Sequence, residues 1–414
     1  MSKPSKIVLA YSGGLDTSVI LAWLVENYGV PVVAYCGDVG QGIDEVEGLH
    51  ERAIKSGASE FHFVDLKREF IEDFCYPMLM AGAKYEGRYL LGTSIARPLL
   101  ARAQVEIARK TGADAVSHGC TGKGNDQIRF EGTFAALAPD LQVIAPWREW
   151  NLRGREDLIN YLKERGIKSN ASATKAYSRD KNLWHVSHEG GGIEDPWNAP
   201  PADAWMMTVD PENAPDTPQD VLIDIEGGKP VAVDGKRMRG EEVVEHLNAV
   251  AGAHGVGRID LVENRVVGMK SRGLYETPGG AVLFEAIRAI EELVLDRQTL
   301  RLRKDLALPI ADLIYEGKWY TPKREALFAA ISSIAKPLTG QVVVRLYKGH
   351  ATAVKRRSPN SLYSEDYATF SKDEVYNQKD ATGFIRLFSL PERIRALTQS
   401  HSAKGETERK GAHR

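Results

Sequence analysis

The sequence predicts an α/β protein: a doubly wound parallel sheet, then an α+β domain, then C-terminal helices. Over the first 165 residues, short β-branched runs alternate with longer helical patterns. This alternation is typical of βαβ units and of a parallel sheet. After Gly166, loops rich in Gly, Pro and Asp, such as "GGGIEDPWNAPPADAW", separate hairpin and helix patterns, which indicates an α+β region.

Five strands and six helices are predicted in the first region. The strands are Ile7–Ala10, Val30–Tyr35, Phe61–Val64, Ala115–Ser117 and Gln142–Ala145. The helices are Thr17–Tyr28, Asp44–Ser56, Arg68–Met80, Arg97–Thr111, Gln127–Leu137 and Gly154–Arg165. In sheets of this kind, ligands bind at the carboxyl ends of the strands, near the point where the strand order reverses.

The second region mixes strand and helix patterns. "VLIDIEGGKPVAVDG" predicts a hairpin with a Gly-Gly turn, and "QVVVRLYKG" with "ATAVKRRS" predicts another strand pair. Helices are predicted at Glu241–Ala251 and Ala281–Leu302. The second of these follows Thr277, a candidate N-cap, and Pro278, a residue favoured in the first turn.

From about Asp366 the chain is predicted to form short helices without a core of their own. An appended segment of this kind typically docks on another subunit or domain. The last residues, "SAKGETERKGAHR", are expected to be a solvated, frayed tail. We therefore expect three parts, residues 1–167, 168–365 and 366–414.

Composition limits the class of protein. The chain is 43% hydrophobic and 27% charged, the balance of a soluble globular protein, and its net charge of −2 indicates no nucleic-acid partner. Cys36, Cys75 and Cys120 lie far apart, which argues against a disulfide framework or a zinc site and fits a reducing, cytoplasmic setting. The apolar run from Ile7 is broken by "YSGGLD", so we expect neither a signal peptide nor a membrane partner.

The stretch "SGGLDTS", residues 12–18, lies where the first strand runs directly into a helix. Such a junction directs backbone N–H groups and the positive end of a helix dipole at one point, and phosphate is its usual ligand. The two glycines allow close backbone approach, and three hydroxyl groups add further donors. Asp16 would repel phosphate, so it fits a helix cap or a Mg²⁺-side ligand better.

The same stretch matches neither the Walker A pattern nor the dinucleotide pattern GxGxxG. It resembles the pyrophosphate-binding loop of the N-type ATP pyrophosphatases, which cleave ATP between its α and β phosphates. The loop alone leaves open argininosuccinate, GMP, NAD and asparagine synthetases, and tRNA-thiolating enzymes. The absence of Cys at position 2 and of a glutaminase-like half argues against the use of glutamine, and the scattered cysteines argue against tRNA thiolation.

A second stretch, "HGCTGKGNDQIRFE" from His118 to Glu131, is predicted to be a glycine-rich loop followed by a helix. Thr121, Asn125 and Asp126 place three short polar side chains near the start of the helix. Arg129 follows about one turn later and suits bidentate recognition of a carboxylate. Asp126 suits an ammonium group or an amide donor.

With "YEGRYLLGTSIARPLLA" and "SRGLYETPGG", these stretches closely resemble the argininosuccinate synthase family over nearly the whole chain. The resemblance implies a nucleotide-binding domain at residues 1–167, a synthetase domain at 168–365 and oligomerisation helices at 366–414. It also implies a homotetramer in the cytoplasm, with a place in arginine biosynthesis and the urea cycle.

The resemblance implies a role for each of the following residues. The ATP site would use Ala10, Tyr11, Ser12, Gly13, Gly14, Leu15, Asp16, Thr17, Ser18, Gly37 and Gly119. Citrulline would be bound by Tyr89, Ser94, Asn125, Arg129, Ser178, Ser187, Glu263 and Tyr275, and aspartate by Thr121, Asn125 and Asp126. Gly37 stands where relatives are expected to carry Ala, and its contact would be through the backbone.

The implied reaction joins citrulline and aspartate at the expense of ATP. The citrulline ureido oxygen attacks the α-phosphorus of MgATP, pyrophosphate leaves into the Ser12–Ser18 loop, and the aspartate amine then displaces AMP from citrullyl-AMP. Asp16, Asn125 and Asp126 are the candidate catalytic residues, with Asp126 accepting a proton or positioning the amine. Mg²⁺ is expected on the phosphate oxygens with few protein ligands, so no metal site built from protein side chains is predicted.

Two other functions remain open from the residues alone. A tRNA-modifying ATP pyrophosphatase would require a basic groove and tRNA-stimulated pyrophosphate release, which the net charge does not favour. A non-catalytic nucleotide-binding module would bind ATP without turnover, and it leaves the four polar-rich stretches without a role.

Overall fold

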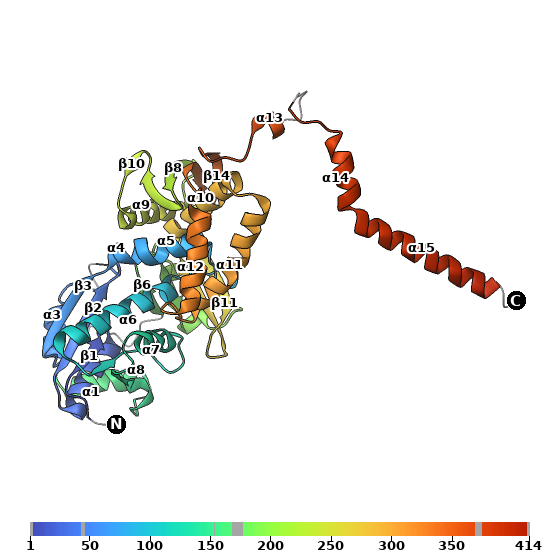
Figure 1. The fold of residues 1–414 in the computed structure, drawn as a ribbon. Coiled ribbons are helices and arrows are strands. Elements are labelled where there is room, and N and C mark those ends of the chain that lie inside the picture. Colours follow the sequence, from blue (N-terminus) through green and yellow to red (C-terminus); the bar gives the residue numbers. More distant parts are fainter. Residues whose placement is uncertain (1–2, 43–45, 153, 168–176, 369–374, 412–414) are drawn as a thin grey trace. The chain divides into compact units, whose positions relative to one another are not determined.

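The computed structural model describes residues 3–42, 46–152, 154–167, 177–368 and 375–411, with side chains described up to residue 400. The chain divides into two compact units, Met1–Ser361 and Leu362–Arg414. The first unit contains the parallel sheet and the antiparallel sheets, and the regular elements described in the second are helices (Figure 1).

The first unit begins with a parallel sheet of five strands. They are β1 (Ile7–Ala10), β2 (Val32–Asp38), β3 (Glu60–Asp65), β4 (Ala115–Ser117) and β5 (Gln142–Ile144), in the order β3-β2-β1-β4-β5. All neighbouring pairs are parallel. The order reverses between β1 and β4, so the loops that follow these two strands flank the switch point where ligands bind in such sheets. The predicted doubly wound sheet is confirmed.

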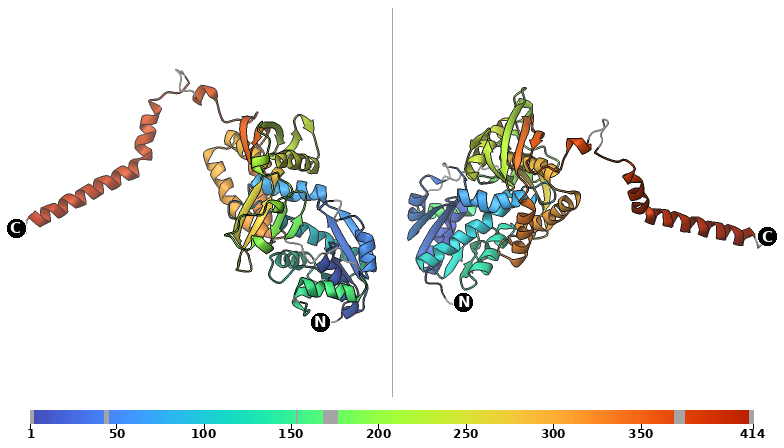
Figure 2. Two further views of the ribbon diagram at one scale, coloured as in Figure 1. Left: turned by 180° about the vertical axis from the view of Figure 1, so that it is seen from behind. Right: turned by 45° about the horizontal axis from the view of Figure 1, so that its top comes forward.

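Alternation along the central strands explains why helices cover both faces of the sheet. Ile7 and Leu9 of β1 pack in one cluster with Ile20 and Leu24 of α1 (Leu15–Tyr28). Val8, between them, packs in the other cluster with α6 (Gly92–Thr111). Because successive side chains of a strand point to opposite faces, a fully apolar strand requires cover on both sides. Figure 2 shows the helices around the sheet from two further directions.

The remaining helices of this part differ from the prediction at their ends. They are α3 (Leu49–Lys55), α4 (Lys67–Glu69), the π-helix η1 (Phe70–Cys75), α5 (Tyr76–Ala81), α7 (Asp126–Leu137), the 3₁₀ turn η2 (Pro146–Arg148) and α8 (Arg155–Glu164). The expected helix Arg68–Met80 is therefore three consecutive segments. Of the expected Asp44–Ser56, the first two residues lie outside the described ones.

Helix α6 starts five residues before the predicted Arg97. A start at Arg97 would place Pro98 in the first turn, where proline is favoured, but Pro98 lies inside the helix. The true start follows Leu91, whose φ of 59° is left-handed. That conformation cannot continue a right-handed helix, so it fixes the N-terminus of α6.

Two antiparallel sheets follow, as the α+β prediction requires. One has the order β10-β9-β8-β13-β14, built from β8 (Gln219–Glu226), β9 (Lys229–Val233), β10 (Lys236–Arg237), β13 (Gly340–Tyr347) and β14 (His350–Arg357). The other has the order β11-β12-β7-β6, built from β6 (Ser178–Lys181), β7 (Val186–Glu189), β11 (Arg258–Asn264) and β12 (Lys270–Glu276). The predicted Gly-Gly hairpin is confirmed, with both turn glycines at positive φ.

Four helices complete the first unit, and one prediction about them is wrong. They are α9 (Gly240–Ala253), α10 (Pro278–Val294), α11 (Arg297–Tyr315) and α12 (Pro322–Ala335), with 3₁₀ turns at Gly191–Ile193, Ala202–Ala204 and Pro211–Asn213. The single helix expected at Ala281–Leu302 is broken, because the Asp296 carboxylate accepts hydrogen bonds from the N–H groups of Gln298 and Thr299 and caps α11. Thr277 occupies the N-cap of α10, but its side chain makes no cap bond.

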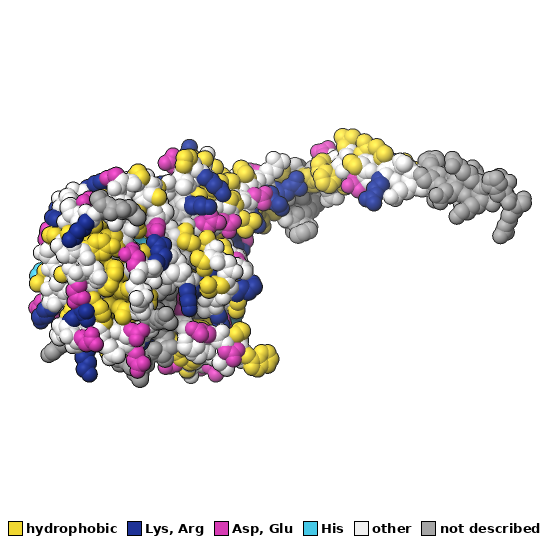
Figure 3. Space-filling view, turned by 90° about the horizontal axis from the view of Figure 1, so that it is seen from below, with side chains coloured by type: hydrophobic (Ala, Val, Ile, Leu, Met, Phe, Trp, Pro, Cys, Tyr) yellow, Lys and Arg dark blue, Asp and Glu magenta, His cyan; other side chains and the backbone are white. Residues whose placement is uncertain are grey.

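The second unit consists of α13 (Glu365–Ala368), α14 (Asp380–Phe388) and α15 (Leu390–Gly411). Its large apolar side chains are exposed, among them Phe384, Leu387 and Phe388 at 63%, 74% and 67%. Figure 3 shows hydrophobic side chains gathered on this helical segment before the grey C-terminal end. Helices with exposed apolar side chains are found as predicted, but α15 is not short, since it has 22 residues and includes the expected frayed tail as far as Gly411.

A buried carboxylate fastens a long loop to the second antiparallel sheet. Glu276 of β12 is fully buried, and it accepts hydrogen bonds from His188 Nε2 (2.9 Å) and from the N–H groups of Met206, Met207 and Thr208 (2.8, 2.8 and 2.9 Å), as well as from the Thr208 hydroxyl. Burial raises the pKa of this carboxyl, but the donors together hold the pKa of Glu276 below its ordinary value.

We expect Glu276→Ala to lower the free energy of unfolding by roughly 3–5 kcal/mol at pH 7, because buried donors lose their acceptor. A carboxyl with a lowered folded-state pKa stabilises above its unfolded pKa, and this contribution disappears as pH falls through the folded value. Urea denaturation from pH 7 to pH 3 measures both effects, and the difference between the two proteins should become smaller as the pH falls. Glu226→Ala, at an exposed surface pair, should change little; a constant difference at every pH would contradict the linkage.

Candidate functional site

The loop between β1 and α1 has the backbone that its glycines predict. Gly13 has a φ of +73°, and a Cβ there would lie 2.2 Å from Leu49 Cδ2. Gly14 is the N-cap of α1, and its N–H donates to Ser12 Oγ at 3.4 Å. The Ser12 hydroxyl also lies 3.1 Å from Thr17 Oγ1. The loop therefore gathers hydroxyl and N–H groups at the positive end of a buried helix.

Asp16 lies in the first turn of α1 with its side chain exposed at the surface, and it does not cap the helix. Surrounding protein nevertheless withdraws its carboxyl from bulk water, which raises its pKa, and the Arg155 guanidinium partly opposes this shift. An exposed carboxylate with oxygen atoms available beside a phosphate-type loop fits the side of a hard cation such as Mg²⁺.

The loops after β1 and β4 meet at the switch point. A Cβ on Gly119 would lie 3.0 Å from Thr17 Cγ2, so the glycine permits this approach. Gln104 of α6 joins the two strands from one face, donating to Val8 O at 2.9 Å and to Ser117 O at 2.8 Å. The expected neighbours of the nucleotide in these two loops are therefore adjacent.

Gly37 lies near the carboxyl end of β2, and its departure from the expected Ala has a local cause. A Cβ at this position would lie 2.5 Å from the Tyr35 hydroxyl oxygen and 2.6 Å from Leu100 Cδ2. Tyr35 is two residues earlier on the same strand, so both side chains would share one face. In this chain, glycine makes room for the buried tyrosine.

Asn125, at the N-terminus of α7, is held from two sides. Its Nδ2 donates to the Tyr315 hydroxyl at 2.9 Å, and its Oδ1 accepts from the Val266 N–H at 3.0 Å. Because a backbone N–H can only donate, the orientation of the amide is unambiguous. One N–H and one lone pair of this buried amide remain for another partner.

Asp126 is the centre of a partly buried ion-pair network. Arg97 Nε donates to one carboxylate oxygen at 2.9 Å and Arg129 Nη1 to the other at 2.8 Å, while Arg97 Nη2 reaches Asp180 at 2.6 Å. Burial raises the pKa of Asp126, but the two guanidinium groups hold that pKa below its ordinary value. A carboxylate held ionised in this way is a weak proton acceptor and a rigid positioning group.

The residues assigned to citrulline come together around three aromatic rings. The Tyr89 ring centroid lies 4.4 Å from that of Tyr275 and 6.3 Å from that of Tyr315. Ser187 of β7 is paired directly with Tyr275 of β12. Burial raises the pKa of Tyr89 to about 12, so its hydroxyl is neutral and can act as a donor.

Glu263 and Ser94 each offer a polar atom without a partner among the described residues. Glu263 Oε1 accepts from the Tyr315 hydroxyl at 2.9 Å, but Oε2 has no hydrogen bond. Burial raises the pKa of Glu263, more than the Tyr315 hydrogen bond and the Arg129 charge lower it. The Ser94 hydroxyl, in α6, is fully buried and likewise unpaired. Buried polar atoms left unpaired are a common mark of a ligand site.

Two residues predicted to bind the amino acids, Ser178 and Thr121, are not in contact with the three tyrosine rings. Ser178 is exposed on β6, opposite Glu189, and Thr121 is exposed in the loop before α7. Neither side chain makes a described contact with the central tyrosines. Ser178 lies on β6 and Ser187 on β7.

The histidines of the region have structural partners. His118 Nε2 lies 3.0 Å from Glu131, and His188 pairs with Glu276. His185 Nε2 lies 2.8 Å from the Thr93 hydroxyl, and burial lowers the pKa of His185 to about 4. Among the described residues, no group of three or more His, Cys, Asp or Glu side chains could hold a metal ion.

Sequence reasoning missed three residues of this constellation: Arg97, Asp180 and Tyr315. Arg97 stands inside the quoted stretch "YEGRYLLGTSIARPLLA", so its charge in an apolar run was an available signal. Tyr315, in "DLIYEG", lies 190 positions from Asn125 and carries no local signal.

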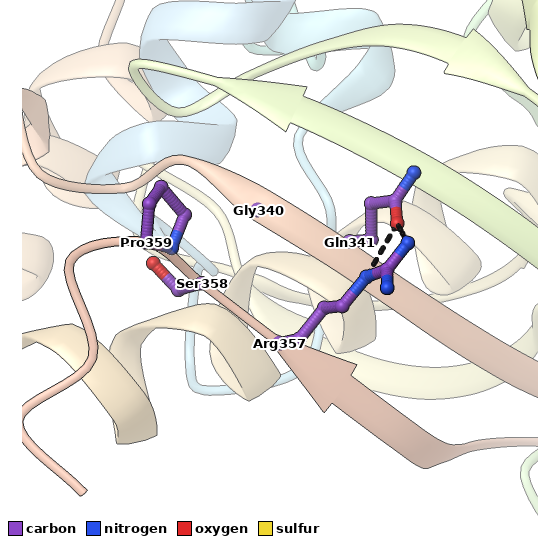
Figure 4. A pocket seen from close by; sticks show the side chains of 5 residues that line it. All are labelled: Gly340, Gln341, Arg357, Ser358 and Pro359. Carbon is purple, nitrogen blue, oxygen red and sulfur yellow. Dashed lines mark hydrogen bonds between the residues drawn. The ribbon is translucent and has the colours of Figure 1, made fainter.

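A hollow of about 360 Å³ lies elsewhere in the first unit. It is lined by Gly340, Gln341, Arg357, Ser358 and Pro359 (Figure 4). Arg357 Nε donates to Gln341 Oε1 at 2.7 Å across it. The hollow lies at the ends of β13 and β14, away from the carboxyl ends of the parallel strands, and none of the predicted site residues lines it.

Known protein families match nearly the whole chain. The family model described as the Arginosuccinate synthase N-terminal HUP domain matches residues 6–168, and the Arginosuccinate synthase C-terminal domain matches residues 177–395. The chain belongs to the argininosuccinate synthase family. Membership makes it an enzyme, a ligase of arginine biosynthesis with ATP as a co-substrate.

Individual members of the argininosuccinate synthase family are closely similar. The argininosuccinate synthase of Shewanella piezotolerans is 63% identical over 393 residues, 95% of this chain and 96% of the relative. That of Pseudoalteromonas atlantica is 61% identical over 401 residues, 96% and 97% of the two chains. Among solved structures, the U34-tRNA thiolase NcsA from Methanococcus maripaludis covers 42% of this chain and 61% of its own, at 16% identity and a TM-score of 0.28, too weak a likeness for any argument. No helix within the described ranges is long and apolar enough to cross a membrane.

We expect Arg97→Met to destabilise the protein by roughly 1–3 kcal/mol, because Asp180 loses this guanidinium and Asp126 keeps only Arg129 in a partly buried network. Thermal and urea unfolding at pH 7 measure the loss. Arg109→Met, which breaks an exposed pair with Asp140, is the matched control and should change little. Equal stability of the two variants would contradict the role given to Arg97.

Proposed function

We propose that the protein ligates L-citrulline to L-aspartate, with ATP, to form argininosuccinate through a citrullyl-AMP intermediate. The observation that carries the proposal is the meeting of three groups of side chains in one place. The Ser12–Ser18 loop contacts the loop after β4, and Asn125 at the end of that loop is hydrogen-bonded to Tyr315, which holds Glu263 of the second sheet.

In the proposed first step, the citrulline ureido oxygen attacks the α-phosphorus of ATP. The bond to the bridging oxygen breaks, pyrophosphate leaves into the Ser12–Ser18 loop, and citrullyl-AMP forms. In the second step, the aspartate amine attacks the ureido carbon, and AMP leaves with the original ureido oxygen. Activation is required because a ureido carbon is resonance-stabilised and its oxygen is a poor leaving group.

The proposed ligand contacts follow the family resemblance. ATP is assigned to Ala10–Ser18 with Gly37 and Gly119. Citrulline is assigned to Tyr89, Ser94, Asn125, Arg129, Ser178, Ser187, Glu263 and Tyr275, and aspartate to Thr121, Asn125 and Asp126. The unpaired oxygen atoms of Glu263 and Ser94 support this assignment, since both atoms are buried and free to accept a ligand hydrogen.

Asp126 is assigned to positioning rather than to proton acceptance. Two guanidinium groups bind its carboxylate and hold its pKa below the ordinary value, which makes it a weak base. Its remaining lone pairs can still accept hydrogen bonds from the aspartate ammonium group. The reaction needs no protein nucleophile, because holding the reactants together in a reactive geometry can supply ~7–11 kcal/mol of the barrier.

Mg²⁺ is proposed as the companion of ATP. The ion supplies charge neutralisation on the phosphate oxygens when bound, and Asp16 is the carboxylate of the phosphate loop that would approach it. A single carboxylate with phosphate oxygens and water is the usual environment of Mg²⁺ at nucleotides.

We also propose that the protein is a homotetramer in the cytoplasm that acts in arginine biosynthesis and the urea cycle. The exposed apolar side chains of the C-terminal unit support an oligomeric state, since such a surface needs cover. Light scattering of the full chain, and of a chain ending at Ser361, measures the state directly.

One assay tests the function against its alternatives. Pyrophosphate release is measured with citrulline alone, aspartate alone, both together, and tRNA. Dependence on the amino acids supports the ligase, stimulation by tRNA supports a tRNA-modifying enzyme, and ATP binding without release supports a non-catalytic module. With ¹⁸O in the ureido group, the label should appear in AMP; unlabelled AMP would exclude the proposed intermediate.

Asn125→Ala should lower turnover by about a hundredfold while leaving the KM for ATP nearly unchanged, because the variant loses the group that aligns the two amino acids. Steady-state kinetics with each substrate varied measures the split. Asn27→Ala, on the surface of α1, is the control. Turnover equal to that of the control would remove Asn125 from the proposed site.

Asp16→Ala should reduce ATP-dependent pyrophosphate release by two orders of magnitude or more, because the cation beside the phosphates loses its protein ligand. The comparison is made over a range of Mg²⁺ concentrations, with Glu51→Ala on the exposed face of α3 as the control. Release at the wild-type rate would show that the Ser12–Ser18 loop is not the pyrophosphate site.

A further inference from the structure

Tyr315, at the C-terminal end of α11, is 1% exposed, and its hydroxyl joins two polar side chains. The hydroxyl oxygen accepts from Asn125 Nδ2 at 2.9 Å, and the hydroxyl proton is donated to Glu263 Oε1 at 2.9 Å. The direction is determined, because an amide N–H can only donate and the hydroxyl has a single proton. Asn125, Tyr315 and Glu263 thus form a directed relay.

The ring and the backbone of Tyr315 are also held in place. The ring stacks on Tyr85 with centroids 3.6 Å apart and planes 4° from parallel. The Arg129 guanidinium lies 5.0 Å from the ring centroid, and Arg129 Nε donates to the Tyr315 carbonyl at 2.9 Å. A ring restrained on both faces keeps its hydroxyl within hydrogen-bond distance of both partners.

The same side chain therefore contacts three residues assigned to the amino-acid substrates, Asn125, Arg129 and Glu263. These residues come from α7 and β11, and Tyr315 comes from α11. The relay occupies one N–H of the Asn125 amide and one oxygen of the Glu263 carboxylate. Asn125 keeps one N–H, and Glu263 Oε2 makes no hydrogen bond among the described residues, although the Tyr275 hydroxyl is close enough to lower the pKa of this carboxyl.

We propose that Tyr315 is a positioning residue of the citrulline site, which orients the free N–H of Asn125 and the free oxygen of Glu263 toward the substrate. The inference rests on the proposed function and deepens it. Tyr315 need not touch the substrate, because it acts through the two side chains whose remaining hydrogen-bonding groups it directs.

The test is Tyr315→Phe, which removes the hydroxyl and keeps the stacked ring. Loss of the relay should raise the KM for citrulline about tenfold or more, because a buried donor and a buried acceptor lose their partner together. The KM for ATP should stay within a factor of about two of the wild-type value. Tyr320→Phe, which removes a hydroxyl that reaches Pro98 O at 3.5 Å, is the matched control.

A second readout separates positioning from simple packing. The groups around Glu263 are Glu189, Arg129, Tyr275 and Tyr315, and the hydrogen bond from Tyr315 lowers the pKa of the Glu263 carboxyl against its burial. Without that donor the pKa rises, so the ionised form is lost at higher pH. The acid limb of the pH profile of kcat/KM for citrulline should therefore move to higher pH in Tyr315→Phe and stay in place in Tyr320→Phe.

The outcomes are distinguishable. A wild-type protein that does not consume citrulline overturns the proposed function. A wild-type protein that does so, with the KM for citrulline and the acid limb equal in Tyr315→Phe and Tyr320→Phe, overturns the role of Tyr315 and leaves the function standing. If Tyr315→Phe does not fold, the single variant Glu263→Gln is compared with the double variant Glu263→Gln, Tyr315→Phe. The neutral amide at position 263 tolerates loss of the Tyr315 donor better than a buried carboxylate does. An unchanged KM between those two would overturn the role as well.

Discussion

The partly buried carboxylate of Asp126, held between Arg97 and Arg129, is the constraint on which the site depends. Removing ionised groups from water costs several kcal/mol per group, and only close opposite charges with good hydrogen bonds offset that cost. Arg97 extends the network to Asp180 on the second antiparallel sheet. The ion pairs therefore define where α6, α7 and β6 lie relative to one another, and the loop that carries Asn125 is positioned with them.

Around this network, the site is built from groups that recognise and orient. Asn125 is fixed by Tyr315 and Val266, the Tyr89 and Tyr275 rings are in contact, and Glu263 presents one unpaired oxygen. Fixed dipoles and charges need no rearrangement when a substrate arrives, which is the physical basis of catalysis by positioning. A ligase with an adenylated intermediate suits such a site, because ATP supplies the leaving group and the protein supplies alignment.

Local patterns predicted the parallel sheet well, because the central strands β1, β2 and β4 are buried on both faces and the crossover helices leave a 3.6-residue repeat. The N-terminal loop was also predictable, because its turn depends on the backbone conformation of Gly13 and Gly14 themselves and not on distant residues. The break at Asp296 was not predicted, because the apolar repeat continues across it and only the carboxylate cap interrupts the helix. The start of α6 was not predicted, because it is fixed by the left-handed backbone of Leu91, which is not glycine and gives no local signal.

The sequence by itself determined the fold class, the family and the phosphate-type loop, because each rests on short stretches whose residues are neighbours along the chain. Only the tertiary structure decided that Tyr315 meets Asn125 from 190 positions away and Glu263 from 52. It also decided that Asp126 is ion-paired on both oxygens. Contacts of this kind depend on how separate elements pack. The energy of burying a charge or an amide depends on hydrogen-bond and ion-pair partners that are distant in the sequence and cannot be predicted from a local pattern.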